Sequence, residues 1–176
     1  MRARYTRSIG LPVLDEDAGE IVGSISGILL HPDSGIVEGF FVRAPGLFPG
    51  DDLFLLSVDI LHWGLRVTIR HSDVLSPFGE LVRLQTLIDS DRPILGQRMV
   101  TEGGRGLGRC SDVQFSTRDF CLEWLFPRRF WRSGIPVPAS QILEVRREAI
   151  ILREGTIRES ENAEVVPLIP QVPETA

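Results

Sequence analysis

The stretch DEDAGEIVGSISGILLHPDSGIVEGFFV, residues 15–42, has the pattern of a β-hairpin. An acidic turn closed by glycine leads into one apolar run, and the turn HPDSG separates it from a second apolar run. Short segments rich in Val, Ile, Leu and Phe between Gly, Pro and Asp turns are typical of paired strands. We therefore predict a hairpin here, and we ask whether it carries chemistry or only builds a scaffold.

The beginning of this hairpin recurs in the second half of the chain. GLPVLDEDAGEIVG at 10–23 aligns with GQRMVTEGGRGLG at 96–108 after one deletion. The alignment then continues and places Cys110 on Ile25 and Cys121 on Ile36. A period of about 84 residues indicates a duplicated domain, because the repeats of a solenoid are typically only ~20–50 residues long.

Two turns of these repeats contain motifs that resemble ligand loops. GGRGLG at 103–108 is followed by RCSDVQF, which alternates like a strand, whereas a phosphate loop requires a helix at that place. DEDAG at 15–19 fails the EF-hand pattern because Glu20 occupies the position that needs glycine. We interpret the first motif as a glycine-rich turn and the second as a solvated acidic turn.

The pattern predicts an all-β protein of two tandem small antiparallel β-barrels packed together. Residues 80–88 are expected to form one short helix, with an opening strand of the second unit as the alternative. We place one domain at 1–78, a second at 79–160, and a Pro-containing tail at 161–176. The strands are expected at about 11–14, 20–31, 35–43, 52–58 and 65–70, and again at 97–101, 106–116, 120–126, 135–138 and 148–153.

Composition points to a cytoplasmic protein that does not bind nucleic acid in general. The net charge is −5 and the isoelectric point about 5.2, whereas binding to phosphate backbones depends on Lys and Arg. We expect a nucleic-acid partner only if a local arginine patch exists. The sequence shows neither the apolar core of a signal peptide nor the run of ~20 apolar residues that spans a bilayer.

The reactive side chains form no recognisable catalytic or metal-binding arrangement in the sequence. Both cysteines align with isoleucines, so we expect two small buried hydrophobes, and a disulfide between them is geometrically awkward. His31, His62 and His71 lack the spacing of metal ligands. We therefore predict that the protein is not an enzyme and binds neither a cofactor nor a metal ion.

The segment LFPRRFWRSG, residues 125–134, is the strongest candidate for a partner contact. It replaces APGLFPGDD of the first half, and Phe130–Trp131 falls where Leu47–Phe48 stands. Aromatic residues flanked by arginine are the usual composition of binding hot spots, and they also suit stacking on single-stranded nucleic acid. The favoured structural alternative is that the rings close a barrel end or pack between the barrels. The candidate contact residues are Arg128, Arg129, Phe130, Trp131 and Arg132.

The order of these motifs resembles the PRC-barrel family. The pattern G.PV, D.D.GE.VG.I, a hairpin, a Gly/Phe loop and VPASQIL covers about 9–72 and 94–155. The family is named for the H subunit of the photosynthetic reaction centre, and a ribosome maturation factor carries the same module. The resemblance implies a β-barrel adaptor for protein–protein contact, with no fixed catalytic residues to transfer. Neither the membrane helix of the H subunit nor the extra domain of the ribosome factor is seen here, so neither activity is carried over.

We therefore expect a non-enzymatic interaction module with an unknown protein partner, and a homodimer is one arrangement to test. An RNA-processing or ribosome-assembly accessory factor is the alternative. A hydrolase or ligand-binding protein that uses a crevice between the barrels is the third hypothesis, and it requires a concave pocket with converging polar groups.

Overall fold

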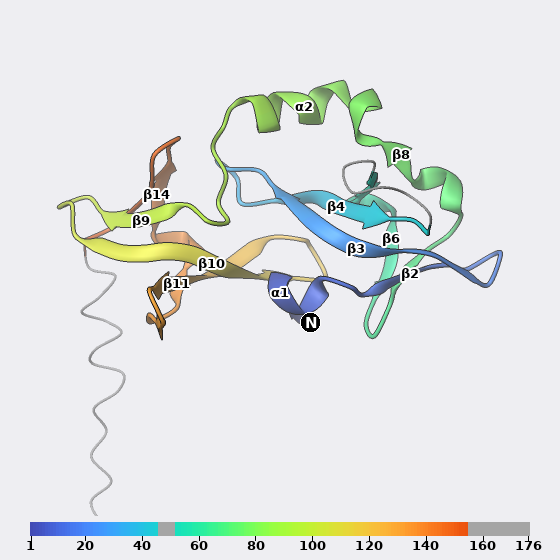
Figure 1. Cartoon of the computed structure of the whole chain (residues 1–176), viewed down its shortest axis with the longest axis horizontal. Coiled ribbons are helices and arrows are strands. Elements are labelled where there is room, and N and C mark those ends of the chain that lie inside the picture. Colours follow the sequence, from blue (N-terminus) through green and yellow to red (C-terminus); the bar gives the residue numbers. More distant parts are fainter. Residues whose placement is uncertain (46–51, 155–176) are drawn as a thin grey trace, which may run out of the picture.

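A computed structural model describes residues 1–45 and 52–154, and strands dominate both halves (Figure 1). The first half forms a seven-stranded sheet in the order β6-β7-β2-β3-β4-β5-β8. Its strands are β2 (Pro12–Asp15), β3 (Glu20–Leu30), β4 (Val37–Arg43), β5 (Leu53–Leu56), β6 (Ile60–Trp63), β7 (Val67–Ile69) and β8 (Ser76–Pro77).

The second half forms an eight-stranded sheet in the order β12-β11-β10-β9-β15-β14, with β1 beside β10 and β13 beside β11. Its strands are β1 (Arg2–Arg4), β9 (Arg98–Thr101), β10 (Gly106–Ser116), β11 (Leu122–Arg129), β12 (Arg132–Ser133), β13 (Val137–Pro138), β14 (Ile142–Val145) and β15 (Ile150–Leu152). The helices are α1 (Tyr5–Ser8) and α2 (Val82–Asp89), with 3₁₀ turns at Ser57–Asp59, Ser72–Val74, Phe78–Glu80 and Ala139–Gln141.

The predicted fold class is confirmed, including the short helix near 80–88, which is α2. The expectation that each unit is wholly antiparallel is wrong. Each sheet contains one parallel pair, β2 with β7 and β9 with β15. The pair arises because β6 and β14 turn the chain once more, so that the last strand runs alongside the first in the same direction. The predicted tail at 161–176 lies outside the described residues.

The two sheets repeat the same irregularities at equivalent positions. Ser26 is the extra residue of a β-bulge between β3 and β4, and Ser111 is the extra residue between β10 and β11. A second bulge leaves Glu38 unmatched in β4 and Glu123 unmatched in β11. Bulges bend a strand and increase its twist, so the two sheets curl at corresponding places. The division into domains at 78/79 stays a prediction.

The turns of the two long hairpins meet and join the sheets through their backbones. The N–H of Val37 donates to the carbonyl of Phe120 at 2.7 Å, and the N–H of Leu122 donates to the carbonyl of Gly35 at 2.8 Å. Ile36 and Cys121 form the antiparallel bridge between these two bonds. These residues align with each other in the repeat, so the contact is self-complementary, like a two-fold interface within one chain.

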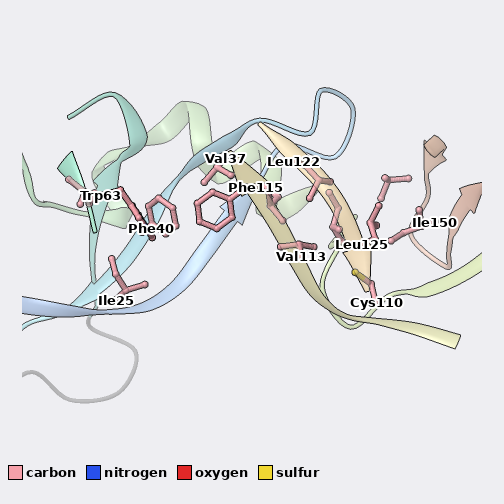
Figure 2. Close-up of a cluster of buried hydrophobic side chains, with 14 of the residues drawn as sticks. Ile25, Val37, Phe40, Trp63, Cys110, Val113, Phe115, Leu122, Leu125 and Ile150 are labelled. Atoms are coloured by element: carbon pink, nitrogen blue, oxygen red, sulfur yellow. The ribbon is translucent and has the colours of Figure 1, made fainter. Parts of the chain in front are cut away.

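One hydrophobic core extends across this junction (Figure 2). Phe115 of the second sheet packs against Phe40 and Trp63 of the first, with ring centroids 5.7 and 5.5 Å away. Removing one such buried ring costs roughly 3–5 kcal/mol of stability, because the cavity that remains does not fully collapse. The sheets therefore share their core, which reduces the problem of a small domain that buries too little surface alone.

The start of the chain belongs to the second sheet, although it lies within the predicted first domain. Strand β1 pairs with β10, with Ala3 opposite Phe115. Buried Asp112 fixes the chain that follows β1: it accepts from Nε of Arg4 at 2.8 Å, from the Thr6 N–H at 3.0 Å and from the Thr6 hydroxyl at 2.7 Å. The Asp112 carboxylate also accepts from the Val113 N–H, so one buried side chain satisfies donors from both halves.

We predict that Asp112→Ala lowers the free energy of unfolding by about 2–4 kcal/mol, because it leaves buried donors and a guanidinium without their acceptor. Urea denaturation followed by tryptophan fluorescence measures this change. Asp33→Ala is the matched control, because it breaks the ion pair between Asp33 and Arg92. The Asp33 side chain is more than half exposed, and such surface pairs contribute at most about 1 kcal/mol. Equal losses for the two variants would contradict the anchoring role of Asp112.

Candidate functional site

The candidate contact residues form the turn of a short hairpin at one end of the second sheet. We call residues 128–132 the RRFWR tip. Arg128 pairs with Ser133 and Arg129 pairs with Arg132 across β11 and β12, which leaves Phe130 and Trp131 as a two-residue turn. The structure therefore brings all five predicted residues together. Most of 125–134, expected as a loop, is strand, because the hairpin continues β11 beyond the edge of the core.

The rings of the RRFWR tip do not pack inside the protein. Phe130 is 87% exposed and Trp131 is 91% exposed. The expectation that they close a barrel end or fill the space between the sheets is therefore wrong. The aromatic side chains that do fill that space are Phe40, Trp63, Phe115 and Phe120. Leu47–Phe48, the aligned pair of the first half, lies outside the described residues.

The backbone at the RRFWR tip is also unusual. Phe130 has a φ of +52°, in the left-handed region where residues other than Gly, Asn and Asp are uncommon. Two-residue hairpin turns with positive φ normally carry Asn-Gly, Asp-Gly or Gly for this reason. A bulky ring at this position costs on the order of 1 kcal/mol. The sequence thus places a strained aromatic residue at an exposed turn, where it adds nothing to the core.

Three further arginines lie beside the tip, and the sequence analysis missed them. Arg98 of β9 is directly opposite Arg109 of β10, and Arg109 is directly opposite Arg128 of β11. Arg105 follows the turn between β9 and β10. The alignment of the repeats combined with the predicted hairpins would have shown this cross-strand arrangement, but neither Arg98 nor Arg109 stands near the tip in the sequence.

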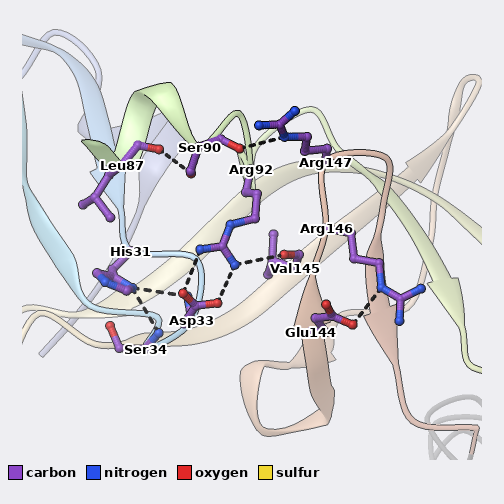
Figure 3. Close-up of polar contacts among 10 residues, drawn as sticks. All are labelled: His31, Asp33, Ser34, Leu87, Ser90, Arg92, Glu144, Val145, Arg146 and Arg147. Carbon is purple, nitrogen blue, oxygen red and sulfur yellow. Dashed lines mark hydrogen bonds and ion pairs between the residues drawn. The ribbon is translucent and has the colours of Figure 1, made fainter. Parts of the chain in front are cut away.

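A groove of about 410 Å³ lies where the two halves meet, as the crevice hypothesis requires. The two carboxylates that line it are both paired with arginines, Asp33 with Arg92 and Glu144 with Arg146 (Figure 3). Arg92 holds Asp33 with two hydrogen bonds of 2.6 and 2.8 Å, and this interaction lowers the pKa of the Asp33 carboxyl. His31 Nδ1 accepts from the N–H groups of Asp33 and Ser34, so the imidazole stabilises its own turn.

The described residues contain no cluster of metal ligands and no membrane-spanning helix. Within residues 1–45 and 52–154, no three His, Cys, Asp or Glu side chains come together in a way that could hold a metal ion. Neither helix in those ranges is long and apolar enough to cross a bilayer. The motif GGRGLG covers part of the turn between β9 and β10 and the first three residues of β10. Gly104 has a positive φ in the turn, as the turn interpretation predicts, and Gly108 has a positive φ at a bulge within β10.

The two cysteines are free, and they differ in their surroundings. Cys110 is fully buried, as predicted, and burial raises the pKa of its thiol to about 12. Cys121 is only half-buried at the junction of the hairpin turns, so the expectation of a second buried cysteine is only partly met. Burial and the neighbouring Asp119 raise the pKa of the Cys121 thiol as well. Neither thiol has the lowered pKa of a catalytic nucleophile.

We predict that the native protein shows one reactive thiol in Ellman titration at pH 8. Only about one Cys110 side chain in ten thousand is ionised at that pH, because its pKa lies four units higher. Cys121→Ser should remove the native reaction, whereas guanidinium should expose Cys110 in both proteins. Rapid modification of Cys110 without denaturant would contradict the packing around β10.

Comparison with known families gives one match. The family model described as "PRC-barrel domain" matches residues 2–82, which include all strands of the first sheet together with β1 and α1. No curated protein matches the chain. The match covers the first of the two ranges that resemble this family, about 9–72. The second range and the RRFWR tip lie outside the matched residues.

Proposed function

Because residues 2–82 of this chain are a PRC-barrel domain, we propose that the protein is a non-enzymatic interaction module that binds a protein partner through the RRFWR tip. The family resemblance, which implies an adaptor, supports this proposal. So does the junction groove, whose two carboxylates, Asp33 and Glu144, are each paired with an arginine.

The exposure of Phe130 and Trp131 is the observation that carries the proposal. Aromatic side chains bury about 150–250 Å² each when they are covered, which corresponds to roughly 4–6 kcal/mol per ring before the costs of association. Phe130 lies in a turn with a positive φ, and its ring projects into solvent. This backbone conformation lowers the stability of the protein only slightly. If a partner covers this aromatic pair, the rings and the flanking arginines have the composition and geometry of an interface hot spot.

We further infer that residues 94–154 are a second PRC-barrel-like unit that has been adapted for binding. Both sheets contain the parallel closing pair and the bulges at Ser26 and Ser111. The units differ at the arginine that precedes the tip. In the first sheet, Arg43 occupies the place of Arg128 and is held by Asp52 through two hydrogen bonds of 2.9 and 3.0 Å. In the second sheet, the hairpin continues into exposed rings.

An RNA-processing or ribosome-assembly role is the second candidate, because exposed rings beside arginines also suit base stacking. Ribonuclease distinguishes the two functions, because it removes an RNA ligand and leaves a protein partner intact. RNA binding weakens steeply as salt rises, because each neutralised phosphate releases counterions, but contacts between the arginines and acidic side chains of a protein also weaken with salt. The cytoplasmic location and the homodimer both stay predictions.

We predict that the triple variant Arg128→Ala, Arg129→Ala, Trp131→Ala loses its partner while it keeps its fold. Affinity purification from native lysate, with mass spectrometry and reciprocal capture by the purified partner, measures the loss. All three residues are exposed, so the melting temperature should change by no more than a few degrees.

The matched control for this experiment is Leu65→Ala, Arg66→Ala, Arg70→Ala. It also removes two exposed arginines and one large exposed apolar residue, since Leu65 is 95% exposed, but it changes the first sheet. Unchanged partner recovery by the tip variant would refute the proposed function. Loss of recovery after ribonuclease treatment would support the RNA alternative.

A further inference from the structure

We propose that the surface beside the RRFWR tip binds an acidic, extended segment of the partner protein through a row of arginines. The row consists of Arg98, Arg109 and Arg128 on three neighbouring strands, and Arg105 and Arg129 lie next to it. This inference rests on the proposed function, because it names the chemistry of the partner surface that would meet the tip.

The register of the sheet places the three arginines of the row directly opposite one another. Arg109 is the Cα partner of both Arg98 and Arg128. Directly opposite residues project from the same face of a sheet, and neighbouring strands are about 4.8 Å apart. Three positive charges therefore follow one another across the strands. Ser133 of β12 continues the row beyond Arg128 without a charge.

No acidic side chain neutralises the row within residues 1–45 and 52–154. Arg98, Arg105, Arg128, Arg129 and Arg132 form no ion pair with the acids described there. Arg109 bonds only to the carbonyl of Gly96, at 2.9 Å. Two acids at the turn before β10, Glu102 and Glu154, accept from the backbone N–H groups of Glu154 and Gly103, respectively.

The first sheet provides an internal comparison for this arrangement. The positions equivalent to Arg98, Arg109 and Arg128 are Pro12, Ser24 and Arg43. The single arginine there is neutralised by Asp52. The same fold is therefore built without the row, so the row is not a requirement of the sheet. Like charges directly opposite each other are destabilising, and such a cost is typical of surfaces that bind a ligand of opposite charge.

The arginines also line a hollow of suitable shape. Arg98, Arg105, Arg109 and Arg129 border an open groove of about 510 Å³, in which Gly106 and Gly108 leave the backbone uncovered. Guanidinium groups bind carboxylates with two parallel hydrogen bonds, so arginines are suited to successive Asp and Glu side chains. An extended segment could cross the strands and continue to Phe130 and Trp131.

An acidic peptide fits this surface better than a nucleic acid does. The row spans only three strands, so it can neutralise a short run of negative charges but not a long polyphosphate backbone. A short run of carboxylates, in contrast, ends where the arginines end. The exposed rings then contact apolar residues that flank the acidic run, as in the hydrophobic centre of an ordinary protein interface.

Fluorescence anisotropy with a fluorescein-labelled deca-glutamate peptide tests this inference on the full chain. We expect Arg98→Gln, Arg109→Gln to weaken binding at low salt at least tenfold and to flatten its salt dependence. We expect the same variant to be as stable as the native protein or more stable, because it relieves repulsion. Arg66→Gln, Arg70→Gln makes the same change in charge on the first sheet and should leave the affinity within twofold.

The remaining outcomes separate this inference from the proposed function. The Trp131→Ala variant should bind deca-glutamate within twofold of native, because the probe carries no apolar residue, yet it should fail to capture the partner. Equal binding of deca-glutamate by the native and Arg98→Gln, Arg109→Gln proteins would overturn the inference and leave the tip hypothesis standing. Tighter binding of labelled deca-uridylate through the same arginines would also overturn it, in favour of RNA.

Discussion

The reciprocal pair of backbone hydrogen bonds between the hairpin turns is the constraint on which the rest of the structure depends. Val37 with Phe120 and Leu122 with Gly35 fix how one sheet sits on the other. That placement brings Phe40, Trp63 and Phe115 into one core and opens the junction groove beside them. The requirement is strong enough that Phe120 adopts a φ of +50° where the equivalent residue is Gly35. The cost of that backbone is offset by the ring, which packs against Phe40 and Trp63.

The two halves share one architecture but differ in how their charged side chains are neutralised. In the first sheet, Asp52 neutralises Arg43, and Arg83 neutralises Glu38, which stands at the second bulge. In the second sheet, Arg2 pairs with Glu123 and Arg4 pairs with Asp112, but the arginines toward the tip have no such acid among the described residues. Uncompensated positive charge is thus found at the tip end of the second sheet, whereas the equivalent arginine of the first sheet is neutralised. The fold tolerates the repulsion among these surface arginines, because the residues that fix the fold are those of the shared core.

Most of the strands could be predicted because their apolar residues alternate between regular turns. The predicted strand at 106–116 coincides with β10, whose buried positions include Cys110, Val113 and Phe115. The sequence RAR of β1 has no such pattern, and its partner lies more than a hundred residues away, so no local signal could reveal it. The composition of the RRFWR tip was evident, but its exposure was not, because Phe and Trp dominate cores as well as interfaces. The arginine row depended on register, which the composition of a strand does not specify.

The position of β1 has a consequence for how the chain acquires its structure during synthesis. Arg4 is synthesised 108 residues before its partner Asp112. At about 5–20 residues per second, that interval is roughly 5–20 s, during which the first sheet can assemble while β1 has no partner strand. The amino-terminal segment is then among the last parts to be fixed, and its long-range pairing slows completion of the second sheet. Any extension fused before Met1 is therefore attached to a strand that pairs only after most of the protein has been made.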